Sequence, residues 1–411
     1  TNIVQTTPQE LSVSGGMETR QEVNITRVST SNDFALLKDL RRNRWTIVPS
    51  AGLDVNYVGL KSVLKAQTSD NGVMDDVRAQ GSVGAILRYV KNEFRMTFNL
   101  PLSLTHTNVI GDTNVTRLRI SPSASMLWKA TDYWTLSGDA GYGTSETPWS
   151  QLITCYLMSN YRTVSRYVAN LSDSQRLYAN LKLNYKDILN EFFAYIQGSA
   201  SRSWSDIVYG TTIDESAHTI IQAVNMPNSS NNYGLNANVS KGVDWHAAKV
   251  EATASFRRNE SMTLRQGVKT NFNSNTYSVN CNIAATIAKP VRLTYNCGWS
   301  MTRTNSQAYS QSIKCFNQSA DVNISFIPNR LLMSVSARHT HNGGLQGKRD
   351  YAFMDASLTL RTKSKQEYVL SVDNIFNTRT FVSRGNNDMT EYYSVYNLRP
   401  RSVMVSTHLK F

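Results

Sequence analysis

Charge and long apolar runs are both scarce in this chain of 411 residues. Charged residues make up only 18% of it, which is low for a soluble surface. No apolar run approaches the roughly 20 residues that a membrane-spanning helix needs. Hydropathy alone would therefore class the protein as soluble, but it does not detect β-barrels, because their alternating strands average out to neutral.

The motifs of common enzyme and zinc-binding classes are also missing. The four cysteines, Cys155, Cys281, Cys297 and Cys315, form no CxxC pair, which argues against a zinc ribbon or a redox motif. There is no G-x-S-x-G, HExxH or P-loop, and no Ser/His/Asp set can be assembled. The run GDAGYG at 138–143 lies on an expected strand with no helix after it, so it is not a nucleotide site. We therefore expect neither an enzyme nor a cofactor.

Two local patterns can be interpreted either as functional sites or as ordinary structural residues. His339 and His341 have the spacing of metal ligands, but no third ligand is evident, and we expect no metal. Cys281 and Cys297 flank an expected turn at 289 and share a face. A disulfide between them suits an oxidising compartment, but directly opposed strand cysteines make a strained bridge, so we expect free thiols.

The formal net charge is +13, and it is not concentrated in any long basic run. The densest patch is DLRRNR at 39–44. A charge spread along many segments argues against a dedicated nucleic-acid module. We expect no nucleic-acid partner.

What the chain has in abundance is strict two-residue alternation of apolar and polar residues. In 93–105 every second residue is apolar, from Phe94 to Leu104, and Arg95 and Thr97 lie between them. The same alternation is found in 44–57, 115–129 and 290–303. Such a period indicates half-buried strands, and we count roughly 18 of them, the first lying somewhere in 9–29.

Short and long connections alternate along the chain. Short links fall near 58–59, 91–92, 130–131, 187–189, 243–245, 289, 328–329 and 363–365. Longer polar links fall at 68–76, 106–114, 146–174, 204–230, 258–274, 304–311, 342–349 and 380–399. An up-and-down meander sorts its connections in this way, with tight turns at one end and loops at the other, whereas a Greek-key sandwich does not.

Aromatic residues gather beside the short turns and belong to the apolar set of their own strands. They are Tyr57, Tyr89, Phe94, Trp128, Trp134, Tyr185, Phe192, Phe326, Tyr368 and the terminal Phe411. If the apolar set faces lipid, these rings form a girdle at one membrane interface. In a soluble β protein they would be core anchors, but nothing else in the chain supplies the second layer. The predicted fold is therefore all-β, a transmembrane antiparallel up-and-down β-barrel.

The C-terminal part resembles a known family. The segments YVLSVDNIFNTRTF at 368–381 and YNLRPRSVMVSTHLKF at 396–411 look like the final two strands of Bacteroidetes-type TonB-dependent outer-membrane receptors. SPSASMLWKATDYWTLSGDAGYG and NYRTVSRYVANLSDSQRLYANLKLNYKD are similar to mid-barrel segments of that group. The resemblance implies location in the bacterial outer membrane and transport of a ligand.

The chain also departs from that family. The resemblance implies about 22 strands and an N-terminal plug with a TonB-contacting segment, and neither the plug nor such a segment is found. We expect residues 1–411 to form one outer-membrane β-barrel domain, with about 18 of a probable 22 strands, whose plug and first strands are absent on the N-terminal side. A complete barrel of about 18 strands is the alternative, since even strand numbers can close.

Candidate ligand-binding residues lie in the long loops and on the polar strand face. The loops at 146–174 and 380–399 are rich in aromatics that could stack on sugars or hold peptides, or that pack the loops together. The candidates there are Trp149, Tyr156, Tyr161, Tyr167, Tyr392, Tyr393 and Tyr396. On the lumen-facing side they are Arg95, Arg119, Arg292 and Arg338. These arginines either bias the lumen toward anionic solutes or pair across strands and with a plug.

The leading functional hypothesis is a TonB-dependent transporter barrel whose loops capture a ligand that then passes through the lumen. The expected partners are outer-membrane lipid and lipopolysaccharide, the TonB complex through an N-terminal region outside this chain, and a surface or periplasmic lipoprotein. The alternative is a structural barrel that serves as a scaffold for lipoprotein partners and does not transport.

Overall fold

The computed structural model describes residues 3–13, 19–35, 40–42, 44–65, 70–109, 113–160, 163–167, 170–215, 219–307, 310–345, 347, 349–362, 364, 366–387 and 390–408. Strands dominate this part of the chain. Within it, no helix is both long and apolar enough to cross a bilayer.

The strands are β1 (Ile3–Val13), β2 (Thr19–Ala35), β3 (Leu40–Arg42), β4 (Trp45–Lys65), β5 (Asp70–Lys91), β6 (Phe94–Val109), β7 (Thr113–Ile120), β8 (Ser123–Lys129), β9 (Trp134–Glu146), β10 (Leu157–Asn160), β11 (Thr163–Tyr167), β12 (Asp173–Asp187), β13 (Phe192–Ile213), β14 (Thr219–Val243), β15 (Ala248–Arg265), β16 (Val268–Ala288), β17 (Val291–Ser306), β18 (Ser310–Ile327), β19 (Leu331–Asn342), β20 (Asp350–Arg361), β21 (Glu367–Asp373), β22 (Thr380–Asn387), β23 (Thr390–Asn397) and β24 (Ser402–His408). Two short 3-10 helices are η1 (Trp149–Gln151) and η2 (Trp245–Ala247).

Most strands pair antiparallel with the next strand along the chain. In the wall, β9 pairs with β12 and β21 with β24, because the segments between them leave the wall. Strands β2 and β6 also pair with β4 and β8, where a neighbouring strand is interrupted. Two short pairings are parallel, that of β11 with β14 and that of β13 with β15. Among the described residues, 22 strands form one sheet, and β22 and β23 form a separate hairpin. Two of the 22, β3 and β8, continue β2 and β7 across a break, and β10 and β11 belong to a segment outside the wall, which leaves 18. The predicted all-β antiparallel meander is confirmed.

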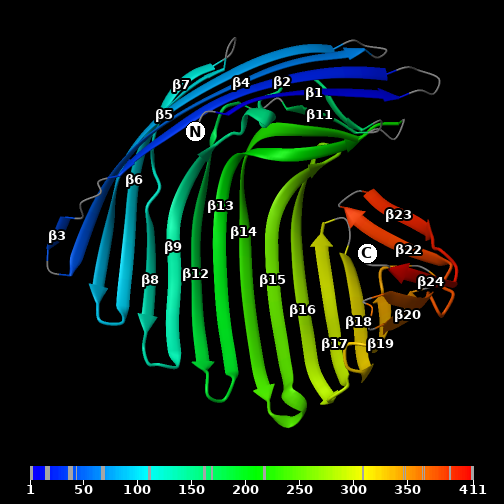
Figure 1. Ribbon diagram of the computed structural model, residues 1–411. Helices are drawn as coiled ribbons and strands as arrows, with labels where there is room; N and C mark the ends of the chain where they lie inside the picture. Colours follow the sequence, from blue (N-terminus) through cyan, green and yellow to red (C-terminus); the bar gives the residue numbers. More distant parts are fainter. Residues whose placement is uncertain are drawn as a thin grey trace.

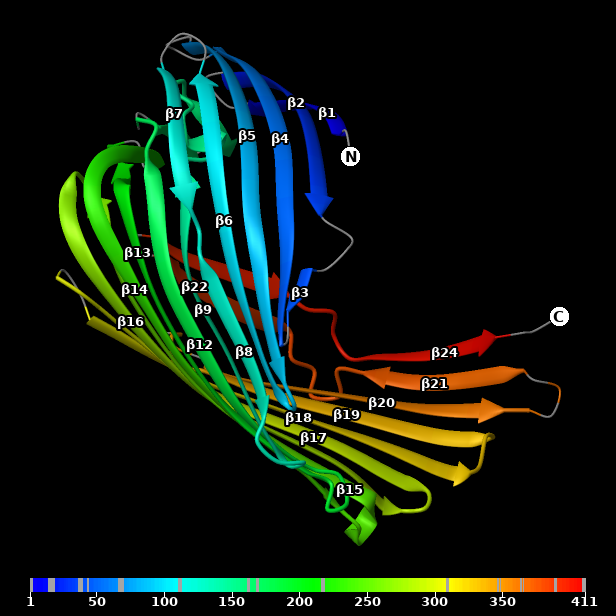
Figure 2. The ribbon, with the colours of Figure 1, turned by 90° about the vertical axis from the view of Figure 1, so that its left-hand side faces the viewer.

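The sheet curls around a concave side, as Figures 1 and 2 show. At one edge β1 pairs with β2, and at the other β24 pairs with β21. Neither edge strand has a second partner among the described residues. The segment between β9 and β12 lies on the concave side, which is therefore called the inner face below (Figure 1).

The register places the two alternating sets on opposite faces, because successive side chains of a strand point to opposite sides. Between β5 and β6, Leu87 pairs with Phe98 and Val83 with Leu102. The next position along each strand is the polar pair Arg88 and Thr97 or the small pair Gly84 and Pro101. A slip of one residue would exchange the faces, so the apolar set fixes the register.

The predicted short turn at 58–59 is wrong. Strand β4 runs without a break from Trp45 to Lys65 and pairs along its length with β5. The reversal lies between Lys65 and Asp70. The other predicted short links agree with the structure to within a few residues, for example at Asn92 and Glu93 between β5 and β6.

Two of the predicted long polar loops are extended hairpins. The range 204–230 is covered by β13 and β14, which end and begin only at Ile213 and Thr219. The range 258–274 is covered by β15 and β16, which reverse at Gln266 and Gly267 with φ of 48° and 76°. Their polar sequences were taken for irregular loops because strands that extend beyond an apolar environment have no apolar face to reveal them.

Candidate functional site on the inner wall

The outer, convex face carries large apolar side chains that are exposed. Leu53, Val83 and Leu104 lie on it with 50%, 59% and 52% of their surface exposed. A water-exposed side chain of this size forgoes about 1.5–3 kcal/mol of burial free energy, and the whole face repeats the pattern. An apolar outer face over a polar inner face is the arrangement of membrane-spanning β-sheets. This places the protein in the bacterial outer membrane.

Aromatic rings form a band along the short-turn end of the outer face. The ring centroid of Tyr89 lies 4.9 Å from that of Trp45 and 6.1 Å from that of Phe94. Further along the sheet, the ring centroid of Tyr185 lies 4.8 Å from that of Trp134. The band continues through Trp128, Phe192, Phe326 and Tyr368, each at the end of its strand. These predicted girdle residues therefore lie at one level, and a role at the membrane interface stays a prediction.

Tyr57 is the exception among the described girdle candidates. It pairs with Val77 far from the short-turn end of β4, and its hydroxyl donates a hydrogen bond to Asp75 at 2.8 Å. Its place in the band is taken by Trp45, which opens the same alternating segment and was missed because a turn was expected at 58–59. Tyr57 ends the apolar run of β4 at the opposite level. Phe411 lies outside the described residues.

The aromatics of the 146–174 loop pack inward. We call residues 147–172 the inward segment; 161, 162, 168 and 169, and with them Tyr161, lie outside the described residues. The guanidinium of Arg27 lies 4.5 Å from the centroid of the Trp149 ring, and that of Arg166 lies 5.1 Å from Tyr156. The ring of Tyr167 meets Tyr209 edge-on at 6.3 Å. Of the two interpretations, the structure favours packing.

A buried apolar cluster joins the inward segment to the inner face. Its members are Val23, Val58, Leu60, Met74, Val109, Leu152, Ile153, Cys155 and Leu171. Burial and the neighbouring Asp70 raise the pKa of the Cys155 thiol, which keeps it protonated and unreactive. The cluster makes the inward segment a fixed part of the wall.

Gln21 connects the inward segment to the wall by hydrogen bonds. Its side chain is 2% exposed. Its Nε2 donates to the Ser62 hydroxyl at 3.0 Å and to the Tyr156 carbonyl at 2.7 Å, and its Oε1 accepts from the Met158 amide at 2.7 Å. A few residues away, the Asp70 carboxylate accepts from the Tyr156 amide at 2.7 Å. The backbone of residues 156–158 therefore makes the hydrogen bonds that water would otherwise make with Gln21 and Asp70 on the inner face.

We expect Gln21→Ala to loosen the inward segment, because it strands the Tyr156 carbonyl and the Met158 amide. Each buried group left without a partner costs about 1–3 kcal/mol. Amide hydrogen exchange of residues 156–158 should accelerate correspondingly. The control is Gln175→Ala, an exposed glutamine on β12; equal exchange in both variants would show that Gln21 does not hold the segment.

Next to the inward segment, a network of ion pairs around Arg119 connects β5, β7, β9 and β12. Its guanidinium, 7% exposed, contacts Glu146 at 3.0 Å and Asp173 at 2.7 Å. Arg117 contacts Asp173 at 3.0 Å, and Arg78 contacts Glu146 at 3.2 Å. Of the predicted lumen arginines, Arg119 is therefore a structural residue whose charge is neutralised.

The other three predicted lumen arginines are exposed. Arg95 and Arg292 lie near the short-turn end, where Arg292 lines a hollow with Lys289 and Asn323. Arg338 lies on β19 at the edge of a second hollow. The structure does not bring these arginines together.

The predicted loop aromatics near the C-terminus lie on the β22–β23 hairpin. Tyr393 and Tyr396 are 61% and 53% exposed. The Tyr396 ring lies 6.3 Å from Phe381, which in turn contacts Tyr351. The side chain of Tyr392 lies outside the described residues.

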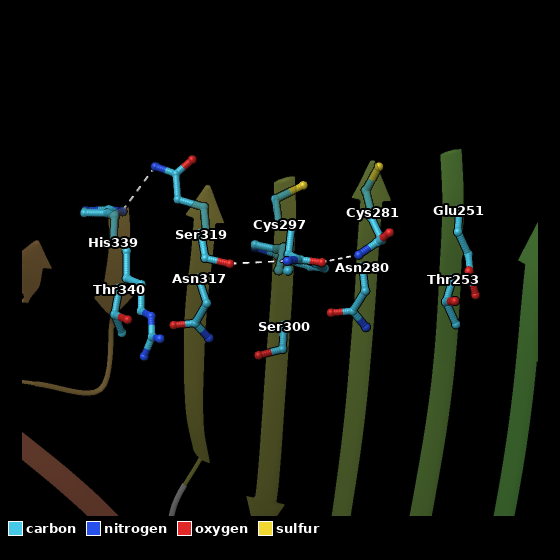
Figure 3. A pocket seen from close by; sticks show the side chains of 16 residues that line it. Glu251, Thr253, Asn280, Cys281, Cys297, Ser300, Asn317, Ser319, His339 and Thr340 are labelled. Carbon is cyan, nitrogen blue, oxygen red and sulfur yellow. Dashed lines mark hydrogen bonds between the residues drawn. The ribbon is translucent and has the colours of Figure 1, made fainter. Parts of the chain in front are cut away.

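The second hollow, which we call the polar cradle, is built from two rows of side chains across β15–β19 (Figure 3). The first row, in register, is Glu251, Asn282, Asn296, Ser319 and Arg338. The second is Thr253, Asn280, Gly298, Asn317 and Thr340. The alternation of β-strands points all of them to the inner face. The hollow has a volume of about 490 Å³.

Hydrogen bonds connect the first row of the polar cradle. The Asn282 amide donates to the Asn296 carbonyl oxygen, and the Asn296 amide donates to the Ser319 hydroxyl at 3.4 Å. At one end, Glu251 accepts from Asn238 at 3.0 Å and contacts Lys249 at 3.4 Å. Carboxamides and hydroxyls both donate and accept, so this surface can replace the water shell of a polar solute.

Gly298 makes the polar cradle hollow. A Cβ added there would lie 2.6 Å from the Asn280 carboxamide oxygen. The amides of Asn280 and Asn317 flank the gap. Sequence reasoning recognised the polar faces of these strands but missed the site, because only the register shows that the two rows meet at Gly298.

The remaining candidates lie on the outer face. His339 and His341 both contact the Asp350 carboxylate, at 3.2 and 2.8 Å. No group of three metal-ligating side chains is found among the residues that the structure describes. Cys281 and Cys297 pair directly across β16 and β17 as free thiols.

Comparison with known proteins finds similarity in solved structures alone. No protein-family model matches the sequence, and no curated protein matches it. The ferric yersiniabactin uptake receptor FyuA from Yersinia pestis is 12% identical, with a TM-score of 0.48, over 96% of this chain and 62% of that one. The siderophore receptor PiuA from Acinetobacter baumannii is 12% identical, with a TM-score of 0.41, over 95% and 65%. The copper transporter OprC is 8% identical, with a TM-score of 0.43, over 88% and 70%.

The chain thus spans less than two thirds of the length of FyuA and PiuA. Identities this low and TM-scores below 0.5 carry no information on ligand or mechanism.

Proposed function

We propose that this chain is the barrel portion of a TonB-dependent outer-membrane transporter of the Bacteroidetes type. The observation that carries the proposal is the polar cradle, a hydrogen-bonding hollow on the inner face of a sheet whose outer face is apolar. The resemblance of 368–381 and 396–411 to the closing strands of that family supports it. A polar solute that leaves water for a narrow lumen must keep its hydrogen bonds, and the two rows of the polar cradle offer them.

The proposal includes a plug and further strands before residue 1. Unpaired strand edges do not occur in hydrocarbon, because each unsatisfied backbone group there costs several kcal/mol. In the proposal, additional strands pair with the free edges of β1 and β24 and close the barrel. Energy coupling to the TonB complex would act through the plug, and the exposed Tyr393 and Tyr396 would belong to the ligand-capturing loops. Outer-membrane lipid, lipopolysaccharide and a lipoprotein are the other proposed partners.

A scaffold barrel without transport is the second candidate. It is favoured by the inward segment, which is attached to the wall by buried hydrogen bonds and covers part of the inner face. A transporter can keep such a segment as a fixed constriction. Blocking the lumen should reduce uptake if the barrel is a transporter and should leave uptake unchanged if it is a scaffold.

Gly298→Leu tests the transporter. The new side chain fills the polar cradle and displaces the Asn280 amide, so we expect uptake by cells to fall about tenfold, equivalent to about 1.4 kcal/mol of lost binding free energy. On filtrates of a mixed polar nutrient pool, cells with the wild-type gene should grow faster than cells with the variant, provided that TonB is present. Gly198→Leu is the control, because a side chain there meets nothing within 4 Å and, beside Leu181, points to the outer face. Equal growth of all strains would favour the scaffold.

A further inference from the structure

A recess on the inner face of β12–β15 differs from the polar cradle in its charge. It has a volume of about 310 Å³, and its polar lining includes Arg176, Tyr178, Ser201, Asn232, Arg257 and Asn259. It is separate from the polar cradle, which begins at Glu251 and Thr253 on β15, nearer the short-turn end.

The floor of the recess is one neutral cross-strand row. Tyr178 pairs with Ser201, Ser201 with Asn232, and Asn232 with Asn259. A phenol, a hydroxyl and two carboxamides therefore lie side by side on four neighbouring strands. Gly234 opens the wall beside this row, since a Cβ there would lie 2.5 Å from the Ser199 hydroxyl.

Two arginines flank that row from opposite sides along the strands. Arg176 belongs to the row of Ser203, and Arg257 belongs to the row of Gly234. The Arg176 guanidinium leans toward the recess and donates to the Ser201 hydroxyl at 3.5 Å. Both side chains are exposed on the inner face.

Neither arginine has a carboxylate partner among the described residues, in contrast to Arg78, Arg117 and Arg119, which form ion pairs. The carboxylate in the same row as Arg257 is Asp139, on β9, four strands away; it accepts a hydrogen bond from Asn180 at 2.9 Å. Neighbouring strands are about 4.8 Å apart, which puts Asp139 about 19 Å from Arg257. Asp139 reaches the recess through Asn180, which also lines it, but among the described residues it forms no ion pair with either arginine.

We propose that this recess binds a small anion that carries hydroxyl groups, with the charged group bound by Arg176 or by Arg257 at one side of the neutral row and the hydroxyls on that row. A guanidinium is the side chain best suited to a carboxylate or phosphate, because its donors form a planar fork. Tyr178, Ser201, Asn232 and Asn259 can each donate to or accept from a hydroxyl. A low-dielectric barrel wall strengthens the attraction. The site requires the inner wall alone and does not depend on energised transport.

The experiment is calorimetric titration of the purified full-length protein in detergent with three sugars that differ in charge. Glucuronate presents a carboxylate, glucose 1-phosphate presents a phosphate, and glucose is neutral. We expect at least one of the two anions to bind at least tenfold more tightly than glucose, and the better of them identifies the charged group. Replacement of both arginines, Arg176→Gln with Arg257→Gln, should abolish that preference.

The matched control is Arg292→Gln, an exposed arginine that lines another hollow of the inner face. It should keep the preference for the anion, because its charge lies outside the recess. The proposal is overturned if none of the three sugars binds, if glucose binds as tightly as the anions, or if the double variant Arg176→Gln with Arg257→Gln keeps the preference. Intact anion binding in a protein that fails to support uptake would count against the proposed transport function and not against this site.

Discussion

Arg119→Met should lower the free energy of unfolding by about 3–5 kcal/mol, the usual effect of removing one partner of a buried ion pair. The substitution keeps much of the side-chain volume but removes the charge that neutralises Glu146 and Asp173. Glu146 is itself 8% exposed and also accepts from the Thr107 hydroxyl at 2.8 Å. Its carboxylate would be left buried with Arg78 as its remaining cation.

The effect should spread to the inward segment, because Asp173 directly follows it. Denaturant unfolding in detergent measures the stability, and labelling of Cys155 by a maleimide, quantified by peptide mass spectrometry, reports whether the segment opens. Cys155 is 5% exposed and should react slowly in the native protein. Arg95→Met is the control, since an exposed side chain changes stability by about 0.5 kcal/mol or less. Equal stability and equal labelling in the two variants would mean that the Arg119 network is dispensable.

The wall of this protein could be predicted from sequence because its two faces meet two different solvents. The alternation in 93–105 fixes both the strand β6 and its faces, and the same pattern recurs in most of the sheet. The prediction fails where that contrast ends. Around residues 58–59 the strand continues with apolar residues on its inner face, where Val58 and Leu60 are buried, so the alternation changes sides. In 258–274 the strands continue with mostly polar residues on both faces, and the period no longer separates strand from loop.

The inward segment could not be predicted for a different reason. Its attachment depends on contacts such as that of Gln21 with Tyr156, which are 135 residues apart in the chain. No local sequence feature indicates that Gln21 is buried. The sequence around Trp149 and Tyr156 also does not distinguish rings that pack on the wall from rings that bind a ligand. Similarly, the polar cradle and the arginine-flanked recess depend on the register of four or five strands. Alternation alone shows which face a residue is on, but not which residues of neighbouring strands are paired.

A lysine in the apolar outer face should separate a membrane-spanning wall from a water-exposed one. Leu100 lies near the middle of the apolar set of β6, with 49% of its surface exposed on the outer face. A lysine at the bilayer midplane costs about 2–4 kcal/mol, so Leu100→Lys should lower the free energy of unfolding in lipid bilayers by that amount.

The neighbouring residue provides the matched control, because Asn99 points to the opposite, inner face of the same strand. Asn99→Lys adds the same charge at the same depth but places it beside water, so we expect a change of about 0.5 kcal/mol or less. Both variants are refolded into lipid vesicles, and the folded fraction is followed on gels as urea is raised. If water covered the outer face, the two variants would have equal stability. If protein covered it, the lysine that replaces Leu100 would be buried, and its larger penalty would appear in detergent as well as in bilayers. A penalty that appears in bilayers and is confined to the Leu100 position requires hydrocarbon on that face.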